Sequence, residues 1–271
     1  MIMSKPESTI EGVEHTGTQI RIASVSELAD FERCVEVQFA VWGYSDGDII
    51  PNRVFVVASK IGGQVIGAYD GDRLIGFAMA LPGYRDGQPY LHSHMLAVMP
   101  EYRNAGLGRR LKVAQRDDAL ARGLVRMEWT FDPLEIKNAH LNIARLGAIV
   151  RSYMPNFYGP STSPLQGGLP TDRLVAEWWL RSERVARAVE EGERKAESIE
   201  ILERVDVPFD VYEWKRNPDR RKLAEELQAR NREKLQSAFA RGLAVIGFDR
   251  APNGDGSYLL GYLSGLEDSP R

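Results

Sequence analysis

Two histidines and a glutamate are the side chains of this sequence whose types and spacing best suit them to moving a proton. His92 and His94 lie two residues apart in a short, mostly apolar segment, Leu91 to Val98, which is typical of a buried strand. Residues at this spacing on a strand project to one face, and an imidazole exchanges protons near neutral pH. Glu128, in the next predicted strand, is a second candidate base. Two hydrogen-bonded structural histidines are the alternative interpretation.

A glycine-containing turn follows this strand directly. It reads Arg103-Asn104-Ala105-Gly106-Leu107-Gly108, and an amphipathic helix is predicted from Leu107 onward. Backbone N–H groups converge at a helix N-terminus, where the helix dipole also favours negative charge. Glycines let a ligand approach the backbone closely. The turn therefore predicts an anion site, most naturally for a pyrophosphate, with an ordinary strand-to-helix turn as the alternative.

The spacing within this turn narrows the class of ligand. The dinucleotide pattern GxGxxG would need a third glycine where Leu111 stands, and the Walker pattern GxxxxGK[ST] does not occur in the sequence. The pattern that fits is RxxGxG, preceded by Val98, Pro100 and Tyr102. It resembles the acetyl-CoA-binding segment of the GNAT-superfamily N-acetyltransferases.

The resemblance implies acetyl-CoA as a cosubstrate and assigns residues to it. In that family the turn amides hold the pyrophosphate of coenzyme A, and the preceding strand separates from its neighbour to accept the pantetheine arm. The residues that would face the pantetheine are Ala97, Val98 and Met99. Those that would surround the pyrophosphate are Arg103, Asn104, Ala105, Gly106, Leu107, Gly108 and Arg109. Asn138 matches an asparagine that family members usually carry near the start of a later helix.

The strand before the turn carries a second resemblance. His92-Ser93-His94-Met95-Leu96-Ala97-Val98 is similar to the same strand of the arylalkylamine N-acetyltransferases, where a His-x-His pair conducts a proton away from the substrate amine. This implies that His94 is the nearer base and His92 its relay. Many GNAT members also place a tyrosine, as the acid for the leaving thiolate, where Ile143 stands here. Tyr153 and Tyr158 are the alternative hydroxyls.

These resemblances imply an acetyl-CoA-dependent N-acyltransferase that moves an acetyl group to a primary amine of a small molecule by direct attack with general-base help. A non-catalytic acyl-CoA-binding or partner-assembly module is the alternative function. A metal site is not expected, because the only other histidines are His15 and His140 and no third ligand is evident.

The elements that must position these residues predict an α/β protein with a mixed sheet. Strands are predicted at 64–69, 73–81, 91–98 and 125–131. Turn signals at Asp70-Gly71, Pro82-Gly83 and Asp86-Gly87 join the first three into an antiparallel meander. The helix from Leu107 then crosses to the fourth strand, which makes the last two strands parallel. The GNAT resemblance implies this same layout, a mostly antiparallel central sheet with a splayed parallel pair and flanking helices.

Two further helices are predicted from apolar spacing. The first runs from a Ser24 or Ser26 cap to Trp42, with Leu28, Phe31, Val35 and Phe39 on one face. The second spans Asp219 to Arg241, and its stripe consists of Leu223, Leu227, Leu235 and Phe239. Because this stripe needs cover, we expect a C-terminal extension, 182–271, to pack on an acetyltransferase domain at 20–181. Residues 1–19 are predicted to be a flexible tail.

Composition excludes several partners. The formal net charge is -3, so no basic field favours nucleic acid. No apolar run approaches the ~20 residues of a membrane span. Cys34 is the only cysteine and is predicted to be a core residue, which excludes an internal disulfide and suits a cytoplasmic setting. A homodimer remains open.

Overall fold

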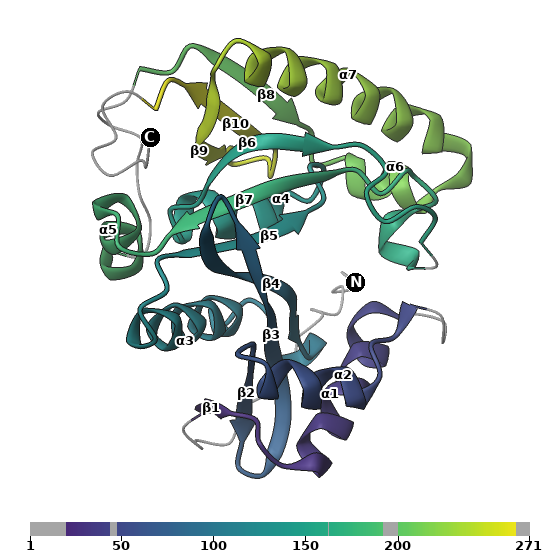
Figure 1. The fold of residues 1–271 in the computed structure, drawn as a ribbon. Helices are drawn as coiled ribbons and strands as arrows, with labels where there is room; N and C mark the ends of the chain where they lie inside the picture. Colours follow the sequence, from purple (N-terminus) through teal and green to yellow (C-terminus); the bar gives the residue numbers. More distant parts are fainter. Residues whose placement is uncertain (1–19, 44–47, 162, 192–199, 264–271) are drawn as a thin grey trace, which may run out of the picture.

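The computed structural model describes residues 20–43, 48–161, 163–191 and 200–263. These residues form one mixed sheet of ten strands, in the order β1-β2-β3-β4-β5-β7-β6-β9-β10-β8 (Figure 1). The strands are β1 (Arg21–Ser24), β2 (Gln64–Asp70), β3 (Arg73–Arg85), β4 (Gln88–Val98), β5 (Arg126–Phe131), β6 (Ile149–Met154), β7 (Arg173–Trp179), β8 (Glu203–Val207), β9 (Ala244–Arg250) and β10 (Gly256–Gly261). The predicted flexible tail at 1–19 lies outside the described residues.

Seven α-helices lie in the described part of the chain. They are α1 (Leu28–Trp42), α2 (Asn52–Lys60), α3 (Leu107–Ala121), α4 (Ile136–Ala139), α5 (Glu183–Glu191), α6 (Val211–Arg216) and α7 (Arg221–Ala240). A π-helical turn, His140–Arg145, continues α4, and short 3₁₀ turns occupy Pro100–Tyr102, Pro164–Gln166 and Pro218–Arg220.

The predicted mixed sheet is confirmed. The pairs β2–β3 and β3–β4 are antiparallel, and α3 crosses over to make β4–β5 parallel. The other strand pairs of the described sheet are antiparallel. This layout agrees with the GNAT fold that the sequence pattern implies.

The predicted end of β3 is wrong. Pro82 and Gly83 do not form a turn but continue the strand, paired with Leu91 and Tyr90 of β4. Pairing of β3 with β2 stops at Ala80, so Pro82 lies where β3 has β4 as its one strand neighbour. A proline is tolerated there because its missing N–H interrupts no ladder on the open side. The hairpin instead turns at Asp86 and Gly87, both with positive φ.

The predicted apolar face of the first helix is confirmed for Phe31 and Val35, which pack into the core, but it is wrong for Leu28 and Phe39. Neither Ser24 nor Ser26 caps α1, whose N-cap is Glu27. The residues of α1 that are buried are Phe31, Cys34, Val37 and Gln38, whereas Leu28 and Phe39 are exposed. Cys34 is a core residue, as predicted.

Helices cover both faces of the β2–β4 meander. α1 and α2 pack on one face, where Phe31 and Phe55 join Phe77 of β3. α3 packs on the opposite face through Leu107 and Leu111 (Figure 1). The strand that carries the two histidines is therefore held between two helical layers.

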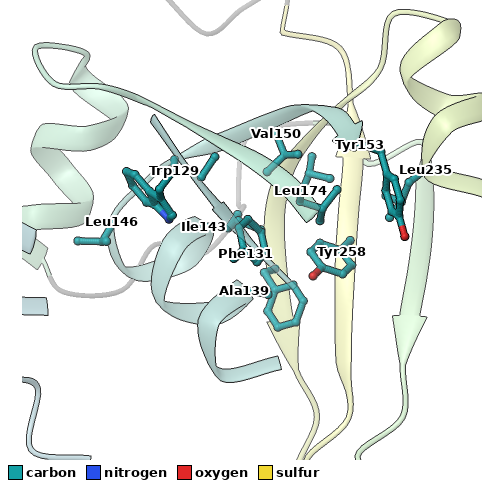
Figure 2. Close-up of a cluster of buried hydrophobic side chains, with 14 of the residues drawn as sticks. Trp129, Phe131, Ala139, Ile143, Leu146, Val150, Tyr153, Leu174, Leu235 and Tyr258 are labelled. Atoms are coloured by element: carbon teal, nitrogen blue, oxygen red, sulfur yellow. The ribbon is translucent and has the colours of Figure 1, made fainter. Parts of the chain in front are cut away.

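A larger core lies where the second half of the chain continues the sheet. β6 pairs with β9 through Val150 and Val245. Side chains from both halves, including Trp129, Leu174, Leu235 and Tyr258, meet in one cluster (Figure 2). Leu227 and Leu235 of α7 are buried there, but Leu223 is 42% exposed, so the predicted stripe is rotated by part of a turn. The division of the chain at 181/182 remains a prediction.

Candidate active site

The central feature of the candidate site is an opening between the two parallel strands. β4 and β5 pair only through Leu91 with Met127 and His92 with Glu128, and then they separate. From Ser93 to Val98, β4 has no strand partner on this side among the described strands. A separated parallel pair leaves backbone hydrogen-bonding groups free to bind a ligand.

A β-bulge lies at the start of this opening. The register between β3 and β4 moves from Met79–Met95 to Ala80–Ser93, which leaves His94 as the extra residue. Ser93 points to α3, where its hydroxyl donates to Gln115 Oε1 at 2.9 Å. After the bulge it is Leu96 that packs on the α3 side and Met95 that packs on the α1 side. The bulge therefore changes which side chains of β4 face α3 at the point where β4 separates from β5.

The two histidines lie close together beside this bulge. Their ring centroids are 6.2 Å apart. Burial, together with the charges of His94, Lys112 and Arg85, lowers the pKa of His92 to about 4, and burial lowers the pKa of His94. Both imidazoles are therefore neutral at pH 7 and retain a lone pair that can accept a proton.

Glu128 is on the same face as His92 but is already engaged. Its side chain is 1% exposed and lies against two guanidinium groups, with Arg85 Nη1 at 2.9 Å from Oε2 and Arg126 bonded to Oε1. Both carboxylate oxygens accept hydrogen bonds from charged donors. An acceptor amine would have to displace an arginine to use Glu128 as its base.

The glycine turn opens α3 as the sequence predicted. Asn104 and Gly106 have left-handed φ values of 64° and 75°, and Gly106 is the N-cap of α3. No side chain caps this N-terminus, so its first N–H groups point outward. A Cβ on Gly108 would meet Leu96 at 3.7 Å and Leu141 at 3.9 Å, which places Gly108 between β4 and the π-helical turn.

The other residues predicted around coenzyme A differ in what their side chains contact. Arg103 donates from Nε to the Val98 carbonyl at 3.1 Å and so lies across the end of β4. Arg109 differs from the prediction, because its guanidinium turns away to backbone carbonyls of Arg145, Ala188 and Val189. The residues that can offer only backbone or apolar contact are Ala97, Ala105 and the buried Leu107, while Met99 is half-buried and Asn138 is exposed on α4.

The two candidate hydroxyls have different environments. Tyr153 lies in the large core and donates to Asp172 Oδ2 at 2.5 Å, and burial and this carboxylate raise its pKa. Tyr153 is therefore not placed to serve the histidines. Tyr158 is half-exposed, with its hydroxyl 2.9 Å from Thr130 Oγ1 on the face of β5 that carries Glu128. Ile143 is buried in the core, as its type requires.

Two polar residues of α3 are buried against the sheet. Gln115 is fully buried, and Lys112 is 2% exposed with its Nζ 3.6 Å from the ring centroid of Trp129. Burial holds the pKa of Lys112 well below its ordinary value. The spacing along the helix could have indicated this burial, because Lys112 lies one turn after Gly108 on the face of α3 that meets the sheet.

Comparison with known proteins assigns a class to this arrangement. Residues 30–142 match the model of the Acetyltransferase (GNAT) family, so this part of the chain is similar to an acetyltransferase domain. No curated protein sequence matches the chain. The matched segment contains the histidine pair, the opening between β4 and β5, and the turn before α3.

Several solved structures are similar at low sequence identity. The ribosomal-protein-S18-alanine N-acetyltransferase from Escherichia coli has a TM-score of 0.48 and 18% identity, over 59% of this chain and 93% of its own. A putative acetyltransferase from Salmonella typhimurium, solved with its cofactor acetyl-CoA, has a TM-score of 0.47 and 18% identity over 59% and 94%. An aminoglycoside 6'-acetyltransferase type Ii has a TM-score of 0.46 and 18% identity over 59% and 97%.

No group of three or more His, Cys, Asp or Glu side chains in 20–43, 48–161, 163–191 and 200–263 could hold a metal ion. No helix within the same ranges is long and apolar enough to cross a membrane.

Proposed function

We propose that this chain is an acetyl-CoA-dependent N-acyltransferase that transfers an acetyl group to the primary amine of a small molecule. The observation that carries the proposal is the continuity of three features along β4 and α3. The bulge at His94, the opening between β4 and β5, and the uncapped N-terminus of α3 follow one another without interruption. An elongated anionic thioester fits such a path.

Each part of the path suits one part of acetyl-CoA. The N–H groups from Asn104 to Gly108 suit the pyrophosphate, because a helix N-terminus favours phosphate oxygens. Met99 N donates to Ile75 O of β3, so by alternation Leu96 and Val98 present their backbone groups to the open side, where Arg103 Nε already donates to the Val98 carbonyl. Those groups suit the amides of the pantetheine arm. The acyl carbon would then lie beside the bulge.

The chemistry at the bulge is a direct transfer. The amine nitrogen attacks the thioester carbonyl, the new C–N bond forms, and the C–S bond breaks with its electron pair on sulfur. In our proposal His94 accepts the proton that the amine loses, and His92 relays it to solvent, as the similarity to the arylalkylamine N-acetyltransferases implies. The thiolate takes a proton from Tyr158 or from water, since Ile143 cannot supply one.

A single incubation separates this function from the alternative. A non-catalytic acyl-CoA-binding or partner-assembly module would bind coenzyme A without consuming the thioester. Acetyl-CoA incubated with the protein and a panel of amines should release free thiol only when an acceptor amine is present. Binding of coenzyme A without thiol release from any amine would favour the non-catalytic module.

A valine at Gly108 should abolish coenzyme A binding. Gly108 has ordinary helical φ and space for a Cβ, so the fold should survive while the added methyl groups occupy the path of the phosphates. Gly106→Val should have the same effect, although its φ of 75° adds backbone strain. Calorimetric titration with coenzyme A measures this, with Ala121→Val at the exposed far end of α3 as the matched control. Unchanged affinity in Gly108→Val would place the site elsewhere.

Removal of the Tyr158 hydroxyl tests the proton donor. If Tyr158 protonates the thiolate, Tyr158→Phe should lower the rate of the chemical step by about 10²-fold, the lower end of the usual contribution of a general acid, without changing coenzyme A affinity. Tyr153→Phe is the control, because that hydroxyl is bound in the core. Single-turnover thiol release measures both variants. If Tyr158→Phe leaves the rate of thiol release unchanged, the thiolate leaves without help from a protein acid.

A further inference from the structure

A cluster of arginines lies beside the histidine pair on the same face of the sheet. Arg85, near the end of the β3–β4 hairpin, reaches back to Glu128 and is 48% exposed. Arg126 approaches Glu128 from β5 itself and is 16% exposed. Because Glu128 is the register partner of His92, both guanidinium groups stand next to the proposed proton path.

The charges of this cluster do not balance. Glu128 is shared by two arginines, whereas its register partner on β7, Glu177, has Arg151 as its one ion-pair partner among the described residues. Three positive and two negative groups leave one positive charge in excess, and the neutral histidines do not change this count. Nε of Arg126 is buried without a hydrogen-bond partner in the described part of the chain.

Aromatic rings hold these guanidinium groups in place. Arg126 lies 4.8 Å from the ring centroid of Trp179, and Tyr90 lies within 5.4 Å of Arg85 and 5.9 Å of Arg126. Stacked guanidinium groups are pre-organised for planar anions and lose little entropy on binding them. A partly desolvated excess charge is costly until an anion compensates it.

From this geometry we infer that Arg85 and Arg126 bind a carboxylate carried by the acceptor amine. The inference rests on the proposed function and narrows its acceptor class to amines that also bear a carboxylate. A guanidinium pair at the histidines would hold such a molecule with its amine toward His94. A polyamine would meet like charge at this position and would bind poorly.

Matched amines test the inference directly. Phenylalanine and phenethylamine differ only in the carboxylate, and phosphoethanolamine with ethanolamine tests a phosphate in its place. We expect phenylalanine to have a kcat/KM at least 10-fold above that of phenethylamine. Arg85→Gln should lower the ratio of the two kcat/KM values by raising the KM of phenylalanine, and Arg85→Lys should restore this ratio in part. Arg204→Gln, which breaks an exposed pair with Asp249 on β9, is the control.

The outcomes separate this inference from the proposed function. Equal kcat/KM values for phenylalanine and phenethylamine, both unaffected by Arg85→Gln, would overturn the carboxylate site but not the proposed acyl transfer. Dependence on Arg85 for phosphoethanolamine alone overturns it as well. If no amine releases thiol, the proposed function fails. The carboxylate site is then tested by calorimetric titration of phenylalanine into the coenzyme A-loaded protein. Binding weakened at least 10-fold by Arg85→Gln supports the site, and no binding overturns it.

Discussion

Replacement of His94 by glutamine should slow the chemical step by about 10²- to 10⁴-fold, the usual contribution of a general base. Glutamine keeps the size and hydrogen-bonding capacity of the side chain but accepts no proton near neutral pH. Coenzyme A affinity should be unchanged, because the turn before α3 is a separate segment beyond the end of β4. Single-turnover thiol release and calorimetry measure the two effects separately.

The pH profile gives this prediction a signature that a structural role would lack. A histidine base works only when neutral, so activity should fall as the pH drops through its pKa. Burial lowers the pKa of His94 below its ordinary 6.5, and burial and neighbouring charges lower that of His92 to about 4. The wild-type rate should therefore be level around pH 7 and decline only below pH 6.5. The decline should disappear in His94→Gln.

Two further variants complete the test of the proton path. His92→Gln should cost less than His94→Gln, because water can replace a relay. Glu128→Gln should leave the acidic limb of the profile in place, since Arg85 and Arg126 already occupy the carboxylate. Full activity of His94→Gln at every pH, combined with loss in Glu128→Gln, would contradict the histidine path and assign the reaction to the carboxylate.

The sequence predicted those parts of the site that local rules determine. Gly106 indicates the turn because its φ of 75° is left-handed and favours glycine. The crossover from β4 through α3 to β5 follows from strand and helix spacing. The histidine pair was visible for the same reason, since a spacing of two on a strand is a local property. The parallel pairing of β4 with β5 followed from the strand–helix–strand connection.

The parts that sequence could not predict depend on contacts between distant segments. The bulge at His94 is a shift in the pairing of β3 with β4, and no residue type in the sequence indicates it. Arg109 was expected at the anion site, but carbonyls near the end of α5, 79 and 80 positions further along the chain, bind its guanidinium. Arg85 joined the site only because its hairpin folds back onto β5.

Deletion of residues 182–271 should leave an insoluble or unfolded protein. The deleted segment supplies β9, the strand neighbour of β6, and side chains such as Leu235 and Tyr258 that complete the large core (Figure 2). Without it, β6 becomes an open edge and the core around Leu174 is exposed to water. Soluble yield and thermal melting of the chain ended at Arg181, compared with the full chain, measure the loss. Equal melting temperatures would contradict it.

A point variant tests the packing of residues 182–271 on the rest of the chain without exposing the core. Lys215 of α6 donates to Asp132 Oδ2 at 2.8 Å, and both side chains are nearly buried. Burial favours a raised pKa for Asp132, but the charge and hydrogen bond of Lys215 outweigh it and hold the pKa below its ordinary value. Lys215→Met leaves that carboxylate buried without its cation, which costs about 3–5 kcal/mol against a typical stability of about 5–15 kcal/mol.

The matched double variant distinguishes a lost partner from lost packing. Asp132→Asn keeps the acceptor oxygen that bonds Leu134 N at 2.8 Å but removes the charge. Lys215→Met combined with Asp132→Asn should therefore recover most of the stability that Lys215→Met loses, as measured by denaturant unfolding. The loss in the single variant should also shrink as the pH falls, because protonation of Asp132 removes the uncompensated charge. A single variant as stable as the wild type would show that α6 is not anchored to the end of β5 through this pair, and the extension would then depend on its apolar contacts alone.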